Sequence, residues 1–267
     1  MLKIKQKKKT ITFLTELTGD KKNSQSNHRV ELKPDILKLI IVNKCYHLNW
    51  NVNFVITNVP ENITQICFYP QFNLDILEYL HPGIKYISYG DAFNCQVDNL
   101  PVNLEYIQFG YSFNQPVNCL PQKLKKIQFG STFNQPVDMI PESIESITLG
   151  EYFDYPVDNL PLNLEYIRFG KLFGHSINSL PNNVKKIYFA DSNEYFTHSI
   201  DILPTGLIEL FLPFHYKETI KMIPISTQSL RISIRYPKDK LDLLLEILGN
   251  KNNILKISSC YGEQKVH

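Results

Sequence analysis

The chain of 267 residues carries 28 lysines and arginines against 26 aspartates and glutamates, a formal net charge of +2. This balance excludes a strong overall field for nucleic acid or a membrane surface, and a hydrophobic content of 43% is ordinary for a folded protein. The five cysteines are scattered without a Cys-x-x-Cys pair, which favours reduced thiols in an intracellular protein over a disulfide framework.

Residues 1–38 are predicted to form an irregular N-terminal segment or cap. Lysines crowd the stretch from Lys3 to Lys9, but no apolar run follows them, so we predict no secretory signal. No stretch approaches the roughly 20 apolar residues of a membrane span. The lysine cluster is a nuclear address, a contact for an anionic surface or a solvated tail, and the tail is the simplest interpretation. We expect an intracellular protein, cytoplasmic or nuclear, with no membrane association.

A repeat of 20 residues governs residues 39–236. Residues 100–117 read Leu-Pro-Val-Asn-Leu-Glu-Tyr-Ile-Gln-Phe-Gly-Tyr-Ser-Phe-Asn-Gln-Pro-Val, and residues 120–137 repeat the pattern. About ten such units follow one another, clearest over residues 80–179, and the unit that starts at Leu180 carries three extra residues. A fixed period of this size predicts a solenoid, in which each coil packs on the next.

Each unit is predicted to contain one short strand. Ile107 and Phe109 share one face of that strand because they lie two residues apart, while Tyr106 and Gln108 share the other. Gly110 ends the strand, where we expect a positive φ that glycine tolerates. The proline-bearing segments lie outside the sheet, since proline donates no backbone hydrogen bond. The predicted fold class is therefore a mainly β repeat solenoid with one short parallel strand per coil.

Two columns of side chains are expected to hold neighbouring coils together. One is aromatic and lies inside the coils, where truncation of a phenylalanine to alanine would cost about 3–5 kcal/mol. The other places asparagines at a buried turn, each bonding backbone groups of its own and the next coil; Asp154 can partly replace asparagine there and Gly174 cannot. The first column comprises Phe93, Phe113, Phe133, Phe153 and Phe173 beside Phe109, Phe129 and Phe169, and the second Asn73, Asn94, Asn114 and Asn134.

Residues 237–267 leave the repeat and are predicted to form a C-terminal cap. A helix at about 239–248 presents four leucines on one face, and a strand at about 254–257 follows it. The tail after Gly262 is expected to fray. Such a cap would cover the open core of the last coil. The four leucines are Leu241, Leu244, Leu245 and Leu248.

The pattern Leu-Pro-x-x-Leu-x-x-Ile-x-Phe-Gly-x-x-Phe-Asn-Gln-Pro-Val resembles the FNIP repeat, a relative of leucine-rich repeats found in social amoebae and in large DNA viruses of amoebae. The resemblance is specific over 80–179 and weaker over 39–79 and 180–236. It implies a leucine-rich-repeat-like fold and a non-enzymatic role in protein–protein interaction, with an unassigned partner. The sequence departs from the pattern at His81, at Ala190 and Pro213 in place of glycine, and after Phe173, where Phe-Asn is lost.

The exposed strand face is the predicted contact surface for a protein partner. It presents aromatic, amide and basic side chains, which interfaces favour; the plainer interpretation, that such residues merely suit an exposed sheet, stays open. A neighbouring column that runs from Lys85 to Lys185 mostly alternates in charge and would support the stacking register. The predicted contact residues are Tyr86, Tyr106, Gln108, Lys126, Gln128, Tyr166, Arg168, Lys186 and Tyr188.

No constellation of residues points to catalysis, so we predict neither an enzyme nor a cofactor. The histidines are dispersed and lack a neighbouring nucleophile or carboxylate in any recognisable spacing. Cys45, His47 and Cys67 fall on adjacent predicted strands of one face, but a zinc site there lacks a fourth ligand and the spacing of paired cysteines. We therefore predict no metal site.

Binding of nucleic acid or an anionic surface is the alternative function. It would use the N-terminal lysines together with Lys126, Arg168 and Lys186, interleaved with tyrosines that could stack on bases. The glutamates of the neighbouring column and the low net charge argue against it, because phosphate binding needs a basic surface. The scaffold function is the one we favour.

Overall fold

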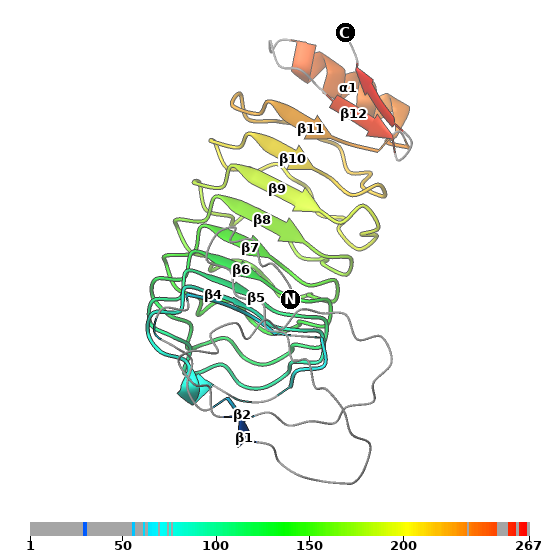
Figure 1. Cartoon of the computed structure of the whole chain (residues 1–267). Helices are drawn as coiled ribbons and strands as arrows, with labels where there is room; N and C mark the ends of the chain where they lie inside the picture. The colour runs from blue at the N-terminus through cyan, green and yellow to red at the C-terminus, as the bar shows by residue number, and fades with distance from the viewer. Residues whose placement is uncertain are drawn as a thin grey trace, which may run out of the picture.

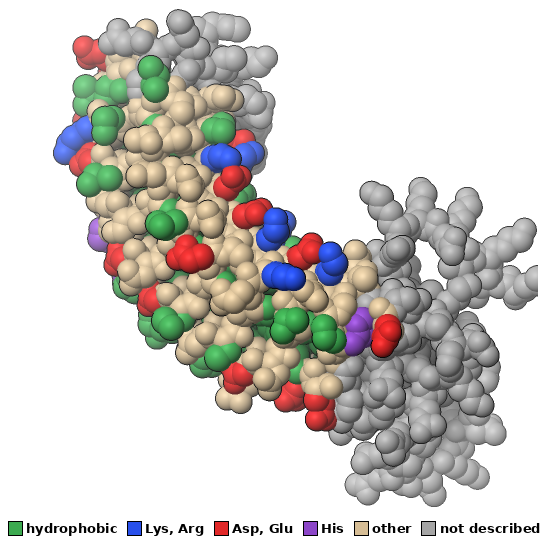
Figure 2. Space-filling view, turned by 90° about the vertical axis from the view of Figure 1, so that its left-hand side faces the viewer, with side chains coloured by type: hydrophobic (Ala, Val, Ile, Leu, Met, Phe, Trp, Pro, Cys, Tyr) green, Lys and Arg blue, Asp and Glu red, His purple; other side chains and the backbone are tan. Residues whose placement is uncertain are grey.

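The chain winds into flat coils that stack in sequence order, and the stack curves along its length (Figures 1 and 2). The structure is a computed structural model that describes residues 29–30, 55–56, 61, 64–68, 70–73, 75, 77–233, 235–249, 256–259 and 262–265. Each coil contributes one short strand to a continuous sheet (Figure 1). The predicted fold class, a parallel β solenoid with one strand per coil and a helix at its C-terminal end, is confirmed.

Nine parallel strands form this sheet in the described part of the chain, in the order β11-β10-β9-β8-β7-β6-β5-β4-β3. Nine of the ten predicted units each supply one of them. The remaining unit, which begins at Leu39, and the segment 1–38 lie outside the described residues except for β1 (Arg29–Val30) and β2 (Val55–Ile56), a separate parallel pair. The other elements of the array are β3 (Gln65–Cys67), η1 (Leu77–Tyr79), β4 (Tyr86–Ser88), β5 (Tyr106–Gln108), β6 (Lys126–Gln128), β7 (Ser146–Thr148), β8 (Tyr166–Phe169), β9 (Lys186–Phe189), β10 (Glu209–Phe211) and β11 (Ser229–Arg231).

Alternation along each strand separates the core from the surface. In β5, Ile107 is fully buried, whereas Tyr106 and Gln108 on either side of it are only half-buried. The middle residue of each strand pairs with the middle residue of the next, so one apolar column runs through the core. Phe109 is buried as well, which confirms the predicted inner and outer faces.

Stacked aromatic rings fill the core, as predicted. The rings of Phe113 and Phe133 lie 6.1 Å apart and nearly parallel, and within one coil Phe109 lies 3.7 Å from Phe113. The stack continues beyond Phe173 through two rings, Phe196 and Tyr216, that the regular spacing does not place there. The three extra residues of that coil shift the aromatic position without interrupting the column.

Glycine recurs after the strands β4 to β8 because neighbouring coils approach closely there. A Cβ atom on Gly130 would lie 1.8 Å from the carbonyl oxygen of Gly110, and one on Gly150 would lie 2.1 Å from that of Gly130. Neither distance is compatible with a real side chain. The prediction of a positive φ was wrong, since none of these glycines adopts one. Glycine is required at this position by space and not by backbone conformation.

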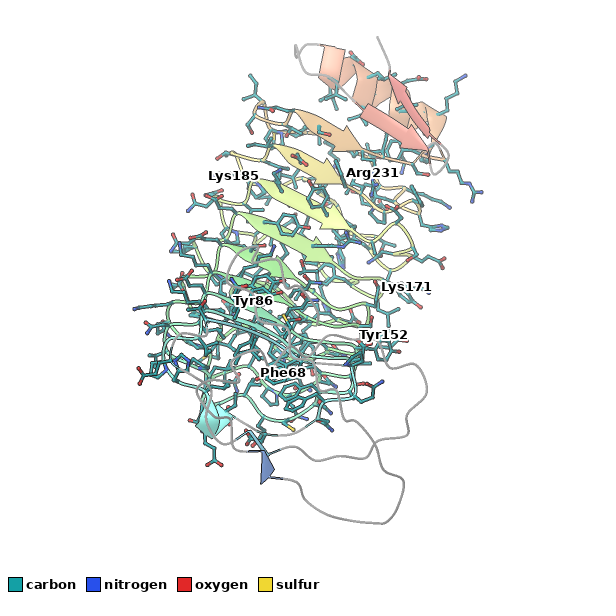
Figure 3. All side chains as sticks on the ribbon, viewed as in Figure 1. Phe68, Tyr86, Tyr152, Lys171, Lys185 and Arg231 are labelled. Atoms are coloured by element: carbon teal, nitrogen blue, oxygen red, sulfur yellow. The ribbon has the colours of Figure 1, made fainter. Side chains whose placement is uncertain are left out.

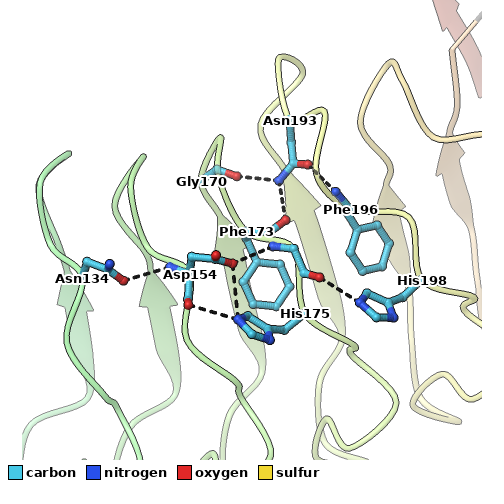
Figure 4. Close-up of polar contacts among 9 residues, drawn as sticks. Asn134, Asp154, Gly170, Phe173, His175, Asn193, Phe196 and His198 are labelled. Carbon is cyan, nitrogen blue, oxygen red and sulfur yellow. Dashed lines mark hydrogen bonds and ion pairs between the residues drawn. The ribbon is translucent and has the colours of Figure 1, made fainter.

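The asparagine column forms a ladder of hydrogen bonds from coil to coil. The backbone N–H of Asn114 donates to Oδ1 of Asn94 at 2.9 Å, and that of Asn134 donates to Oδ1 of Asn114 at the same distance. Asp154 continues the ladder, which ends at Gly174 because glycine offers no side-chain acceptor (Figure 4). The prediction of a buried turn was wrong: these side chains are half-buried or exposed. A side chain at the edge of the coil reaches the next coil without having to enter the core.

Asn193 holds the next coil in place by a different arrangement. Its side chain is only 1% exposed, and its Nδ2 atom donates to the carbonyl oxygens of Gly170 and Phe173 in the preceding coil, at 2.9 Å each. Its Oδ1 atom accepts the N–H group of Phe196 at 2.9 Å (Figure 4) and that of Tyr195 at 3.0 Å. One buried amide therefore both shapes the inserted loop and attaches it to its neighbour.

The C-terminal cap begins with α1 (Lys238–Gly249), close to the predicted helix. Leu244 and Leu248 are buried against the last coil, and Leu241 and Leu245 pack beside them. The strand predicted at about 254–257 lies slightly later, as β12 (Lys256–Ser259). Fraying after Gly262 was wrong, because β13 (Gly262–Lys265) pairs antiparallel with β12 and so gives those backbone groups partners. Among the described residues, no helix has both the length and the apolar character needed to cross a membrane.

Candidate interaction surface

In each strand from β3 to β11, three consecutive residues pair with the neighbouring strand. We define the strand face as the first and third of these residues, which point outward. The register aligns the first residues in one column and the third residues in another. All nine predicted contact residues fall on it. The first column holds Tyr86, Tyr106, Lys126, Tyr166 and Lys186, and the second Gln108, Gln128, Arg168 and Tyr188. Whether they contact a partner stays a prediction.

The strand face lies on the inner side of the curve, over an open hollow of about 1030 Å³. Figure 2 shows this concave side, along which lysine, arginine and glutamate side chains gather. Seven of the nine predicted contact residues line the hollow; Tyr86 and Tyr106 do not. The sequence prediction missed residues that line it beyond the ends of the strands, such as Asp91, Tyr111 and Glu151. Their position directly after the glycine column was the signal that could have found them.

The N-terminal part of the strand face is an aromatic stack. The rings of Tyr86 and Tyr106 lie 4.6 Å apart and almost parallel, and the Lys126 Nζ atom lies 5.4 Å from the centre of the Tyr106 ring. The Tyr106 hydroxyl donates to Oε1 of Gln108 at 3.2 Å. Partial burial, with Tyr86 beside it, raises the pKa of Tyr106. The hydroxyl therefore stays neutral and acts as a hydrogen-bond donor.

In the C-terminal part of the strand face, the charged side chains form ion pairs with neighbouring residues of the protein. Lys186 and Tyr188 both contact the carboxylate of Glu209, with the Lys186 Nζ atom 2.7 Å from Oε1. Arg231 forms an ion pair with Asp191 and lies over the ring of Phe211. Partial burial and the hydrogen bond to Glu209 raise the pKa of Tyr188. These side chains already have partners inside the protein.

The alternating charge column stands beside the strand face, at the start of the strands. Nζ to Oε1 distances are 2.7 Å for Lys85–Glu105, 3.1 Å for Lys125–Glu145 and 2.6 Å for Lys185–Glu165. Figure 3 shows Lys185 at this edge, whereas Tyr152 and Lys171 lie at the opposite edge. The predicted pairing is confirmed. All six side chains are roughly half exposed, so each pair contributes on the order of 0.2–1 kcal/mol.

A metal-binding arrangement is not found in the part of the chain that the structure describes. There, no three or more histidine, cysteine, aspartate or glutamate side chains gather in a way that could hold an ion. Cys45 and His47 lie outside the described residues. Cys67 lies on the strand face, where burial raises the pKa of its thiol and so disfavours the thiolate that a metal would bind.

Comparison with known proteins identifies the repeat and the fold. A model of the FNIP repeat matches residues 95–132, 113–138 and 133–172. The chain is also similar to the solved structure of CroV588, described as a novel circular LRR protein, with a TM-score of 0.53 and 23% sequence identity. That similarity covers 69% of this chain and 36% of the length of CroV588, and at this identity it shows a leucine-rich-repeat-like fold. No curated protein matches the sequence.

Proposed function

We propose that the chain, which matches the FNIP repeat over residues 95–172 and folds as a leucine-rich-repeat-like solenoid, is a non-enzymatic scaffold that binds another protein through its strand face. The observation that carries the proposal is that most residues lining the hollow differ from the residues that stack the coils. The residues that recur from coil to coil make the contacts that stack the coils. Most of the residues that line the hollow on the concave side vary from coil to coil, although recurring residues such as Gly110 and Gly130 line it as well.

The recurring residues make contacts that hold the coils together. Phe133 is buried in the aromatic column, Gly130 lies against the carbonyl oxygen of Gly110, and Asn134 continues the hydrogen-bond ladder. Each of them therefore contributes to the stacking of the coils. The concave face of a solenoid is an extended surface that repeat proteins commonly use for binding, and its tyrosines and arginine are residue types that dominate interface energies.

Affinity capture with matched variants tests the proposal. Replacement of Tyr106, Tyr166 and Arg168 by alanine should lower the recovery of a bound protein at least about tenfold, because large tyrosine and arginine side chains dominate interface energies. The control carries alanine at Met139, Leu162 and Ile202, which are 68%, 68% and 62% exposed but lie in the segments that connect the strands. Recovery that falls equally in both variants, or in neither, would mean that the strand face is not the contact surface.

Nucleic acid binding has less support. It requires a continuous basic track, yet Lys186 is paired with Glu209 and Lys185 with Glu165. The N-terminal lysines lie outside the described residues. A salt titration separates the two functions: affinity for a single-stranded oligonucleotide that falls steeply with added salt would favour this alternative. We expect no measurable binding at physiological salt.

A further inference from the structure

We propose that the centre of the strand face, over β6, β7 and β8, binds an acidic segment of a protein partner. Lys126 and Arg168 would hold two anionic side chains of that segment, and Ser146 and Thr148 would form the floor between them. All four residues line the concave hollow. This inference rests on the proposed scaffold function and adds to it the chemistry of the partner.

The first argument is the distribution of unpaired charge. Within the described residues, Lys126 and Arg168 are the exposed cations of the strand face that form no ion pair; Lys186 and Arg231 are paired with Glu209 and Asp191. Lys126 contacts only the ring of Tyr106, which leaves its three N–H donors available. A basic pair without internal acceptors is complementary to an anionic ligand.

The two carboxylates at the start of β7 and β8 are already occupied. Glu145 and Glu165, at the start of β7 and β8, each form an ion pair with a lysine of the same column. Those pairs lie at the edge of the sheet, whereas Lys126 and Arg168 project from the strands themselves. Glu145 and Glu165 therefore do not cancel the positive charge at the centre of the strand face.

The floor between the two cations is polar and open. Ser146 lies opposite Lys126 in the register, and Thr148 lies opposite Arg168. Neither hydroxyl makes a side-chain hydrogen bond within the part of the chain that is described, and both side chains are short and half-buried. Two unused hydroxyls between two unused cations can donate hydrogen bonds to carboxylate or phosphate oxygens.

The spacing fits an extended peptide. Lys126 and Arg168 lie two strands and two residues apart, so their Cα atoms are separated by about 12 Å, given about 4.8 Å between strands and about 3.3 Å per residue. Both side chains are long and converge readily. An extended segment that crosses the strands diagonally would therefore place acidic residues about two to four positions apart over this pair. Tyr166, which lies two residues before Arg168 on β8 and in the same column as Lys126, would pack against the apolar part of that segment.

A protein segment suits the site better than nucleic acid. The hollow is also lined by Asp91, Glu151 and Glu165, which would repel a uniformly charged phosphate backbone on both sides of the basic pair. A peptide can place its acidic residues over Lys126 and Arg168 and neutral or basic residues elsewhere. A carboxylate and a phosphorylated side chain share the chemistry that the pair recognises, so the experiment has to distinguish them.

Selection of random linear peptides, displayed on phage, against the full chain tests this inference. We expect the selected peptides to be enriched in aspartate and glutamate at two positions. Binding of a selected peptide should fall at least about tenfold when both positions carry the amides, and at least about tenfold with the variant K126E/R168E. The same peptide with lysine at both positions should bind that variant more tightly than it binds the unchanged protein. Phosphoserine in place of the acidic residues tells whether phosphate is preferred to carboxylate.

The control is Lys171→Glu, which makes the same kind of charge change on an exposed lysine outside the hollow. It should leave peptide affinity within about twofold, because Lys171 does not line the hollow and the charge of an exposed side chain is partly screened by salt. Unchanged circular dichroism and thermal unfolding of each variant would show that the fold is intact.

Several results would overturn the inference. Selected peptides without acidic residues, whose binding is lost with Tyr166→Ala but not with K126E/R168E, would refute the acidic segment and leave the proposed function standing. Peptides insensitive to every strand-face variant would refute both. Failure to select any peptide would overturn the inference alone, because the capture experiment tests the scaffold function separately. Binding of an oligonucleotide that K126E/R168E abolishes, without acidic peptides, would assign the site to nucleic acid instead.

Discussion

The coils of residues 80–179 and those of residues 180–236 stack by different means. In the first group, glycine allows the backbones to approach and a ladder of asparagine side chains joins one coil to the next. In the second group, individual side chains replace the glycines and the asparagine ladder. Asn193 forms four hydrogen bonds from inside the core, and Arg231 forms an ion pair with Asp191 two coils away.

The difference between the two groups of coils shows which contacts the stacking of the repeat requires. Close backbone approach depends on every member of the glycine column, so a change at one position disturbs two coils. After Gly170 the column ends at Ala190, and the coil that starts there is attached by the Asn193 amide, which bonds the Gly170 carbonyl oxygen. The array therefore tolerates the loss of its repeating signature where a buried polar side chain bonds the backbone of the neighbouring coil in another way.

The largest effect is expected at Asn193. Replacement by alanine leaves two carbonyl oxygens and two N–H groups without this partner, three of them on buried residues, so the free energy of unfolding should fall by about 4 kcal/mol. Urea denaturation followed by circular dichroism measures it. The matched control is Asn163→Ala, which removes one exposed hydrogen bond and should cost about 1 kcal/mol or less. Equal effects of the two changes would show that Asn193 does not replace the ladder.

The next largest effect is expected in the glycine column. In Gly130→Ala the new Cβ atom would lie 1.8 Å from a backbone oxygen, so the coils must separate, at a cost of about 3 kcal/mol. Gly206→Ala is the control, because its nearest neighbour would be 3.7 Å away. Thermal unfolding of both variants gives the comparison. Similar melting temperatures would contradict the claim that close approach selects glycine in the regular coils.

A smaller effect is expected in the asparagine ladder. Asn114→Ala removes the acceptor of the Asn134 N–H at the half-buried edge of the coil, which should lower the free energy of unfolding by about 1 kcal/mol. Asn114→Asp keeps an acceptor in the same place, as Asp154 does naturally, and should cost less. A loss as large as that of Asn193→Ala, measured by the same urea denaturation, would remove the distinction between the two regions.

The smallest effect is expected in the charge column. Glu105→Gln removes an ion pair whose side chains are both about half exposed, so the free energy of unfolding should fall by about 0.5 kcal/mol or less. The effect should shrink further when the measurement is repeated at high salt, because exposed pairs are screened. A loss that is large and independent of salt would mean that this column holds the coils together.

The sequence predicts those features that depend on a period. Two residues 20 apart occupy the same place in neighbouring coils, so the aromatic column around Phe133, the charge pairs and the two faces of β5 follow from spacing alone. The physical cause that selects a residue type is harder to predict than the position of that residue in the coil. The glycine was expected for its backbone conformation, and only the three-dimensional distance between Gly130 and Gly110 reveals the steric cause.

Features outside the period were not predictable. The role of Asn193 depends on how an insertion folds, and the partners of Lys186 and Tyr188 depend on Glu209 in a degenerate unit. For the same reason, the sequence could place nine contact residues on one face but could not separate those already paired from Lys126 and Arg168. That distinction rests on side-chain contacts across coils.

Site-specific photocrosslinking tests the central claim, that the strand face carries the contact surface, most directly. A photoreactive phenylalanine derivative is introduced at Gln128, in the hollow, or at Met139, which is 68% exposed in a connecting segment. The scaffold function predicts a crosslinked complex with a discrete protein from position 128 and none from position 139. A crosslink from position 139 alone would contradict it.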